Sequence, residues 1–229
     1  MKFAIMADIH ANLEAFQACL IDSNRQGCTH YAFLDDFVGY CADPKACIAI
    51  VRGMNAPCVK GNHDEYCTAD LPLGDFNPRA AKLIKWTRQQ LSEDDRRWLS
   101  GLSYVLRVEN FTIVHATLDS PQRWGYIFDK LAAAASFANQ NTQVCFFGHT
   151  HISEVFIRDN MIRGGTYTKF KIETSKTYFA NVGAVGQPRD DNPKAAYATY
   201  DLKERTVELR RVPYDIETTR RKIQDAGLG

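Results

Sequence analysis

The sequence predicts an α/β domain, and three observations carry that prediction. Short apolar segments of strand length alternate with amphipathic segments of helix length up to Val59. Each of the first three apolar segments ends at a cluster of polar side chains, as buried parallel strands typically do where they leave a sheet. Of the 229 residues, 45% are apolar and 24% are charged, which is typical of a globular protein. A disordered chain, a coiled coil and a collagen-like repeat are therefore excluded.

The N-terminal elements follow a β-α-β-α-β order, which predicts that the first three strands run parallel. Asn12 is suited to cap a helix, and the apolar residues after it recur at helical spacing until Gly27 ends the helix. Pro44 suits the first turn of a second helix, which closes near Gly53. The three strands are expected at residues 2–7, 31–34 and 57–59.

The stretch from Thr68 to Leu102 is predicted to be a helical hairpin, inserted into this frame as a cap-like segment. Residues 78–91 have the apolar spacing of a helix. Ser92 is suited to cap a second helix, whose first turn is acidic. Trp86 and Trp98 are most simply interpreted as a small core of the insertion itself.

Strands dominate the remainder of the chain, and we expect a single domain over residues 1–229. A turn at Glu109 and Asn110 predicts a β-hairpin. The expected strands lie at residues 104–108, 111–115, 144–147, 155–157, 178–181, 196–200 and 206–212, and the expected helices at 131–139 and 215–226.

The charge balance and the cysteine content restrict which partners and which cellular compartment are expected. There are 28 basic and 27 acidic residues, so the net charge of +1 does not favour stable nucleic-acid binding. No apolar stretch is long enough for a membrane span, and the N-terminus lacks the pattern of a signal peptide. The seven cysteines include no CxxC pair, which indicates free thiols in a reducing cytoplasm. We expect a cytoplasmic monomer or small homo-oligomer.

Five of the six histidines fall at predicted strand ends, together with acidic residues and an asparagine. In the motifs D-x-H and H-x-H the polar residues are two positions apart, so at a strand end both side chains point the same way. Ligands of open α/β sheets bind at the carboxyl ends of strands, which predicts that these residues share one edge. The candidates are Asp8, His10, Asp36, Asn62, His115, His149 and His151.

Imidazole nitrogens with carboxylate and amide oxygens are the ligands of borderline divalent metals. The candidates are too numerous for one tetrahedral zinc ion. They suit two metal ions about 3.5–4 Å apart that share one carboxylate and one water. A water bridged in this way loses a proton readily and becomes a nucleophile, which indicates attack on phosphorus.

In this order the motifs resemble those of the calcineurin-like metallophosphoesterase superfamily, whose series is D-x-H, G-D, G-N-H-[DE], a lone His and G-H-x-H. The match spans residues 1 to about 191. Residues 36–44 and 181–190 are most similar to the compact bacterial branch of phosphodiesterases and diadenosine tetraphosphatase-like proteins. The resemblance implies a four-layer α/β/β/α sandwich, in which helices cover two facing mixed sheets.

The resemblance also implies a ligand set for each of two divalent ions, which are manganese, iron, zinc, cobalt or nickel. His63 would not bind metal; it would hydrogen-bond the phosphate or protonate the leaving oxygen. Asn62 and His63 would both contact the substrate. The first ion would be held by Asp8, His10, Asp36 and His151, and the second by Asp36, Asn62, His115 and His149.

Four residues, Asp35, Cys41, Ala116 and Val182, depart from the family pattern, and none of the departures removes a ligand. Asp35 replaces the glycine that normally precedes the bridging Asp. It is either a solvated or locally hydrogen-bonded carboxylate or a partner of a ligating histidine. Cys41 replaces another glycine and is either at the site edge or a buried inert thiol. Asp64 is a candidate catalytic residue that would orient His63.

The predicted substrate is a small phosphodiester or nucleotide. A phosphomonoesterase or protein phosphatase is an alternative. However, the protein phosphatases of the superfamily carry Asp and Arg where this chain has Gly39 and Tyr40. A non-catalytic scaffold that keeps the fold is a third reading, and it is disfavoured because every ligand position is filled.

Loops around the metal ions must select the substrate. Arg189 is either a second phosphate contact or a solvated arginine on a turn. Trp124 and Tyr126 either stack on a base or aromatic leaving group or pack within their own loop.

Overall fold

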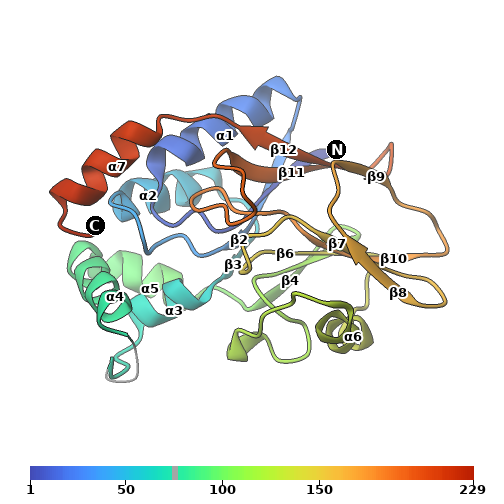
Figure 1. The fold of residues 1–229 in the computed structure, drawn as a ribbon, viewed down its shortest axis with the longest axis horizontal. Helices are drawn as coiled ribbons and strands as arrows, with labels where there is room; N and C mark the ends of the chain where they lie inside the picture. Colours follow the sequence, from blue (N-terminus) through green and yellow to red (C-terminus); the bar gives the residue numbers. More distant parts are fainter. Residues whose placement is uncertain (74–76) are drawn as a thin grey trace.

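The computed structural model describes residues 1–73 and 77–229, and these form a four-layer α/β/β/α sandwich (Figure 1). Within the described residues there are two six-stranded mixed sheets and seven α-helices. In spatial order the first sheet contains β3 (Cys58–Lys60), β2 (His30–Asp35), β1 (Lys2–Met6), β11 (Ala195–Asp201), β12 (Thr206–Val212) and β9 (Lys169–Lys171). The second contains β4 (Val105–Val108), β5 (Phe111–Val114), β6 (Val144–Phe147), β10 (Thr177–Asn181), β7 (Val155–Arg158) and β8 (Ile162–Gly165).

Each sheet contains three neighbouring parallel strands, on one side of the first sheet and in the centre of the second, and their ends provide the candidate site. The predicted parallel order of the first three strands is confirmed, because β2 pairs parallel with both β1 and β3. In the second sheet, β6 pairs parallel with both β5 and β10. The remaining pairings, including the predicted β4–β5 hairpin, are antiparallel.

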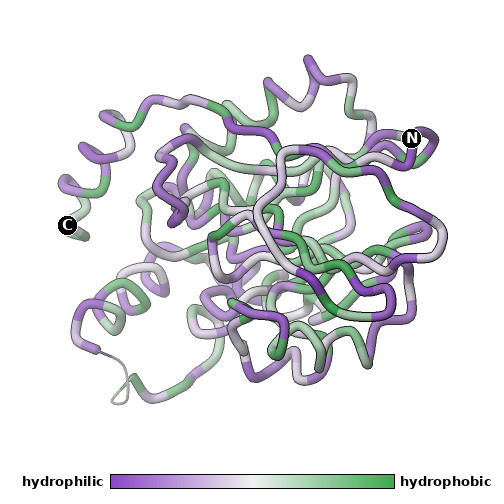
Figure 2. The backbone as a smooth tube through the Cα atoms, turned by 45° about the vertical axis from the view of Figure 1, so that its right-hand side comes forward, coloured by the Kyte–Doolittle hydropathy of each residue, from purple (hydrophilic) through white to green (hydrophobic). Residues whose placement is uncertain are grey.

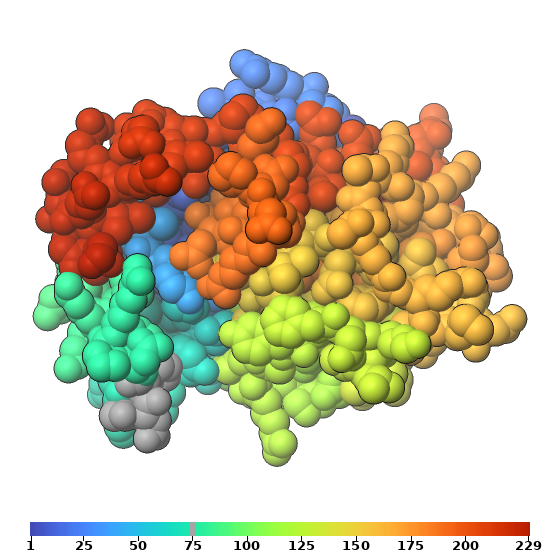
Figure 3. All heavy atoms as spheres, viewed as in Figure 1, coloured from blue at the N-terminus to red at the C-terminus, as the bar shows by residue number. Residues whose placement is uncertain are grey.

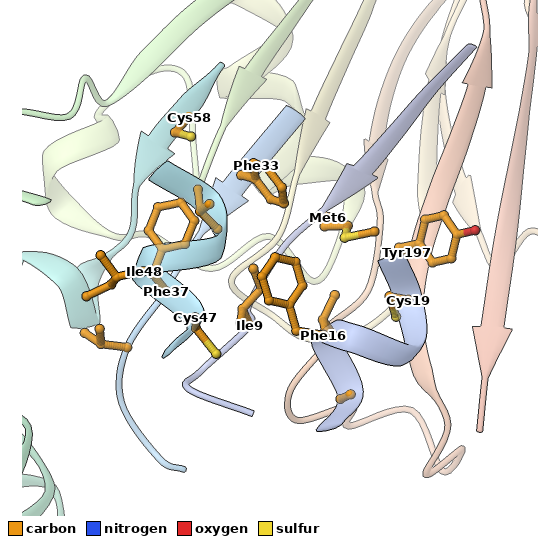
Figure 4. Packing of buried hydrophobic residues seen from close by; sticks show 14 of the residues in the cluster. Met6, Ile9, Phe16, Cys19, Phe33, Phe37, Cys47, Ile48, Cys58 and Tyr197 are labelled. Atoms are coloured by element: carbon orange, nitrogen blue, oxygen red, sulfur yellow. The ribbon is translucent and has the colours of Figure 1, made fainter. Parts of the chain in front are cut away.

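Three apolar layers hold the four structural layers together. Alternation along β1 places Phe3 and Ile5 in the core between the sheets, whereas Met6 faces the helices. On that outer face, Met6 belongs to one cluster with Phe16 of α1 (Leu13–Arg25) and Ile48 of α2 (Pro44–Met54), and Ile48 lies beside Phe37 (Figure 4). A third cluster joins the second sheet to α6 (Lys130–Asn139). Figure 2 shows the same division, with apolar strands inside and hydrophilic segments on the outer helices.

The predicted insertion contains α4 (Pro78–Gln90) and α5 (Glu93–Ser100), and α5 is capped by Ser92 as expected. The expectation that Trp98 belongs to a separate core of the insertion is wrong. Its ring lies 5.4 Å from the Phe37 ring, and the insertion also contributes Ile84 and Leu99 to the main helix-side core. The insertion is therefore packed on the α/β frame.

One helix and two strands were not anticipated. α3 (Asn62–Thr68) begins directly after β3, because Gly61 occupies the cap position and its N–H donates to Asp64 Oδ2 (3.1 Å). Asn62 and His63 consequently lie on the first turn of a helix rather than in a loop. β8 and β9 are short and largely exposed. The last helix, α7 (Ile216–Asp225), packs against α1.

All seven cysteines are buried and free, as the absence of CxxC pairs predicted. In the described part of the chain, no helix has the length and apolar character needed to cross a membrane.

Candidate metal centre

The structure brings all seven predicted ligands to one edge, where the parallel strands of both sheets end. Four of them adopt the left-handed backbone conformation, with φ of 55° at Asp8, 49° at His10, 66° at His149 and 61° at His151. Residues other than glycine rarely adopt this conformation, and it concentrates at functional sites. These sharp turns aim the paired side chains of D-x-H and H-x-H into a common space.

Glycine is required at two positions, Gly148 and Gly61, because the backbone there lies very close to the side chains of predicted ligands. A Cβ at Gly148 would lie 2.6 Å from Oδ2 of Asp8, and a Cβ at Gly61 would lie 2.0 Å from Oδ1 of Asp36. Any side chain at either position would therefore displace a predicted ligand.

The predicted ligands form two groups on either side of Asp36, and a third, overlapping group of possible ligand atoms joins His63 to His10 and Asp36. Asp8, His10 and His151 form one group, with their ligand atoms within 4.8 Å of one another, and Asp36, His115 and His149 form the other. Oδ2 of Asp36 lies 3.8 Å from Nε2 of His10 and 3.5 Å from Nε2 of His115. This oxygen is thus placed between the two groups, where a shared ligand must be.

Each of the four histidines in these groups has one ring nitrogen against a backbone carbonyl. A carbonyl only accepts, so that nitrogen carries the proton and the other nitrogen presents its lone pair to the site. The pairs are His10 Nδ1 with Val38 O (3.1 Å), His115 Nδ1 with Leu34 O (2.8 Å), His149 Nε2 with Trp124 O (2.9 Å) and His151 Nδ1 with Gln187 O (2.6 Å).

The lone-pair nitrogens face one another in two close contacts. Nε2 of His10 is 3.1 Å from Nε2 of His151, and Nε2 of His115 is 3.1 Å from Nδ1 of His149. With the tautomers that the carbonyls select, neither contact has a hydrogen to share. Two nitrogens bound to one metal at about 2.0–2.1 Å lie about 3 Å apart. The donor set therefore fits a cation in each group.

Burial keeps two of these imidazoles, those of His10 and His149, in the neutral form that binds metal. It lowers the pKa of His10, and it lowers the pKa of His149 to about 3. Burial and the nearby Asp8 raise the pKa of Asp36. Burial alone would also raise the pKa of Asp8, but His151, His115 and His10 together outweigh it and hold that pKa below its usual value. Cationic charge between these groups would favour the ionised form of both carboxylates.

His63 lies beside the two groups and has an unused ring nitrogen. Its ring centroid is 4.9 Å from that of His10, and its backbone N–H donates to Oδ1 of Asp36 (2.7 Å). Nδ1 is buried without a hydrogen-bond partner among the described residues. Burial lowers the pKa of His63 to about 3.

The hydrogen bonds of the Asp64 carboxylate in the described residues go to backbone groups and not to the His63 ring, and the orienting role considered for Asp64 stays a prediction. Its Oδ1 accepts from the backbone N–H groups of Phe37 (2.9 Å) and Val38 (3.2 Å), and its Oδ2 accepts from Gly61. The buried carboxylate thus joins the loop after β2 to the start of α3.

Asp35 is fully buried, so the solvated carboxylate considered for it is wrong. Its Oδ1 accepts from the backbone N–H of Ile9 (2.9 Å), between the two ligands of D-x-H. Its Oδ2 has no hydrogen-bond partner in the described residues, so a bond to a ligating histidine is also excluded. Cys41 is buried, and burial raises the pKa of its thiol to about 12, in agreement with an inert thiol.

Aromatic and basic side chains surround the ligand groups. The Tyr40 ring packs on His10 (4.6 Å) and His63 (4.7 Å), and the exposed Arg189 donates to the Tyr40 hydroxyl (3.3 Å). The Tyr126 ring stacks on His149 at 4.2 Å. Sequence reasoning missed Tyr40 and the carbonyl of Trp124; the latter has no side-chain signal.

The insertion also reaches this edge. A cavity of about 260 Å³ lies between α4 and the Tyr40 loop, and its lining includes Arg79, Leu83 and Gln187. In Figure 3 the turquoise insertion and the lime segment around α6 lie on either side of the teal residues that follow β3.

Comparisons with known proteins agree with this architecture. The family model of the calcineurin-like phosphoesterase superfamily domain matches residues 1–205. An uncharacterised protein of Methanocaldococcus jannaschii is 33% identical over 227 residues, which cover 96% of this chain and 90% of that protein. A metallophosphoesterase from Sphaerobacter thermophilus has a crystal structure with a TM-score of 0.87 and 34% identity, covering 100% of this chain and 95% of the other. A Pyrococcus horikoshii protein shares the fold, with a TM-score of 0.80 at 17% identity over 100% of this chain and 94% of that one.

Fold and site together define the class of metallophosphoesterases, whose chemistry is the hydrolysis of phosphoesters at divalent metal. Within that class, the chain belongs to the calcineurin-like phosphoesterase superfamily.

Proposed function

We propose that the protein hydrolyses a small phosphodiester or nucleotide with two divalent metal ions, which are manganese, iron, zinc, cobalt or nickel. The observation that carries the proposal is the pair of facing imidazole contacts, one on each side of Asp36. When bound, such ions activate a water and neutralise charge on the phosphoryl oxygens. The proposed ligands are Asp8, His10, Asp36 and His151 for the first ion, and Asp36, Asn62, His115 and His149 for the second.

The protein's own contribution is to hold the ligands in place before substrate arrives. Backbone carbonyls fix the four imidazoles, so little reorganisation is needed on binding. Asn62 Oδ1 lies 3.2 Å from Nε2 of His115, at the half-buried side of the second group. This location leaves Asn62 accessible to both a metal ion and a phosphate.

His63 is proposed as the group that hydrogen-bonds the phosphate or protonates the leaving oxygen. Its ring is adjacent to His10, and its Nδ1 has no protein partner in the described residues. Packing against Tyr40 fixes the ring plane. A donor held in this way can act on an oxygen that develops charge as the ester bond breaks.

A diester is favoured over a phosphoprotein because of the residues after Asp36. Gly39 and Tyr40 occupy the positions where the protein phosphatases of the superfamily carry an Asp and an Arg. Here the Tyr40 side chain is contacted by the guanidinium of Arg189, from the loop before β11. It is proposed as an additional phosphate contact.

The test begins with removal of metal by a chelator and reloading with each candidate ion. We expect two ions per chain by elemental analysis, and faster hydrolysis of bis-p-nitrophenyl phosphate than of p-nitrophenyl phosphate. Absence of hydrolysis by fully metallated protein would refute the enzymatic proposal. A strong preference for the monoester would instead support a phosphomonoesterase.

A further inference from the structure

Two exposed aromatic rings continue outward from a predicted metal ligand. Tyr126 stacks on His149, with ring centroids 4.2 Å apart and an interplanar angle of 22°. Phe128 lies parallel to Tyr126, at 5.4 Å and 5°. Tyr126 is 52% exposed and Phe128 is 59% exposed, whereas His149 is only 5% exposed. The stack therefore runs from the buried site to the solvent.

The buried side chain between the two rings fixes this arrangement. Ile127, between the two rings, is 1% exposed and belongs to the apolar cluster under α6. In an extended segment alternate side chains share a face, so burying Ile127 directs Tyr126 and Phe128 outward together. The carbonyl of Trp124 anchors the start of the segment on His149. The two exposed rings are thus held at a defined position relative to the metal centre.

The stack is also close to where a phosphate would bind. His149, on which Tyr126 stacks, is a predicted ligand, and its Nδ1 lies 3.1 Å from Nε2 of His115. The Tyr126 ring is therefore in direct contact with the second group of predicted ligands. A phosphoester bound at the metal ions would have its attached groups near this ring.

We infer that Tyr126 and Phe128 form a stacking subsite for a planar group of the substrate, a nucleobase or an aryl ring. The inference rests on the proposed function, because the phosphate of the same molecule must be held at the metal ions. Exposed parallel rings offer large flat surfaces with little rotamer entropy to lose. Stacking of one base on an aromatic side chain strengthens binding by about 5- to 150-fold.

The experiment compares two ligands that carry the same phosphate. Isothermal calorimetry on the full-length, metal-loaded protein measures the Kd of AMP and of ribose 5-phosphate, which lacks the base. The variants are Phe128→Ala, which removes the ring, Phe128→Leu, which keeps apolar bulk, and Phe128→Trp, which keeps a flat surface. Met161→Ala removes an equally exposed apolar side chain from the turn between β7 and β8 and is the matched control.

We expect the unmodified protein to bind AMP at least about fivefold more tightly than ribose 5-phosphate. Phe128→Ala and Phe128→Leu should remove that preference and leave the Kd of ribose 5-phosphate unchanged, while Phe128→Trp and Met161→Ala should preserve it. No preference in the unmodified protein, or an equal loss for both ligands in Phe128→Ala, would overturn the inference.

A second copy of the chain is the competing occupant of these rings. Size-exclusion chromatography of the same variants tests it: a Phe128→Ala protein that changes oligomeric state but keeps its AMP preference also overturns the inference. The binding readout does not require turnover. A preference for AMP in a protein that hydrolyses nothing would therefore support the subsite while refuting the proposed reaction.

Discussion

The buried floor of the site, formed by the predicted metal ligands, and its exposed rim, formed by Arg189, Tyr126 and Phe128, are held in place in different ways. Six of the seven predicted ligands are buried, and the four imidazoles that face one another are held by backbone carbonyls. At the rim, Arg189, Tyr126 and Phe128 are exposed and are held mainly by other side chains. The floor is therefore fixed by the strand ends of the fold itself, whereas the rim depends on loop residues that can change without disturbing those strands.

This difference predicts which residues control the metal chemistry and which control the choice of substrate. Backbone bonds to imidazole are insensitive to the identity of the residue that supplies the carbonyl, so metal chemistry should survive variation at those positions. Substrate choice should depend on the rim side chains. Substitutions at the floor should therefore abolish turnover, and substitutions at the rim should alter substrate affinity.

The largest effect is expected for Asp36→Asn at the floor. Because one oxygen of Asp36 faces both groups, its loss should disrupt both metal positions and lower kcat by about 10⁴-fold or more. Elemental analysis with kinetics on bis-p-nitrophenyl phosphate measures this. Asp159→Asn, on the turn after β7, is the control. Near-normal turnover with two bound ions would contradict the shared position of Asp36.

His63→Ala separates chemistry from metal binding. We expect both ions to be retained and kcat to fall on the order of 10²- to 10³-fold, because a positioned proton donor is lost while the ligands remain. His30→Ala is the matched control, since His30 is the one histidine outside the site and contacts Thr29. Loss of metal in His63→Ala would show that His63 is a ligand and refute the role proposed for it.

The sequence predicted the parallel strands well because each is a dense apolar segment with a polar end. β8 and β9 were missed because they lack that signal: Gly164 and Gly165 end β8, and β9 is a short, lysine-flanked strand. They form because β7 and β12 supply their hydrogen-bond partners. α3 was missed because its start depends on the Asp64 carboxylate accepting from Gly61, a contact that the spacing alone does not distinguish from a turn.

The candidate ligands could be found from the sequence because their residue types and spacing follow from metal chemistry. The structure brings them together, and their role as ligands stays a prediction. The groups that hold the histidines could not be predicted, because every residue has a backbone carbonyl and the sequence does not indicate which ones accept from an imidazole. In the structure they are the carbonyls of Val38, Leu34, Trp124 and Gln187. The position of Trp98 depended on tertiary packing with Phe37, which no local pattern encodes.

Asp64→Ala tests whether the floor depends on buried support. It would leave the N–H groups of Phe37, Val38 and Gly61 without their acceptor, so we expect a loss of at least about 2 kcal/mol in the free energy of unfolding. Urea denaturation of the metal-loaded protein measures it. Unchanged stability together with a large fall in kcat would instead support a direct action of Asp64 on His63.

Arg189→Gln should have the smallest effect, and it is the sharpest test of the rim. The side chain is exposed and its partners are Gln187 and Tyr40, so solvent screens its charge. We expect KM for a phosphodiester to rise about two- to fivefold with kcat unchanged. Arg163→Gln, on β8 away from these contacts, is the control. If kcat fell while KM stayed constant, Arg189 would act on the transition state, and the division between a chemical floor and a binding rim would be wrong at this residue.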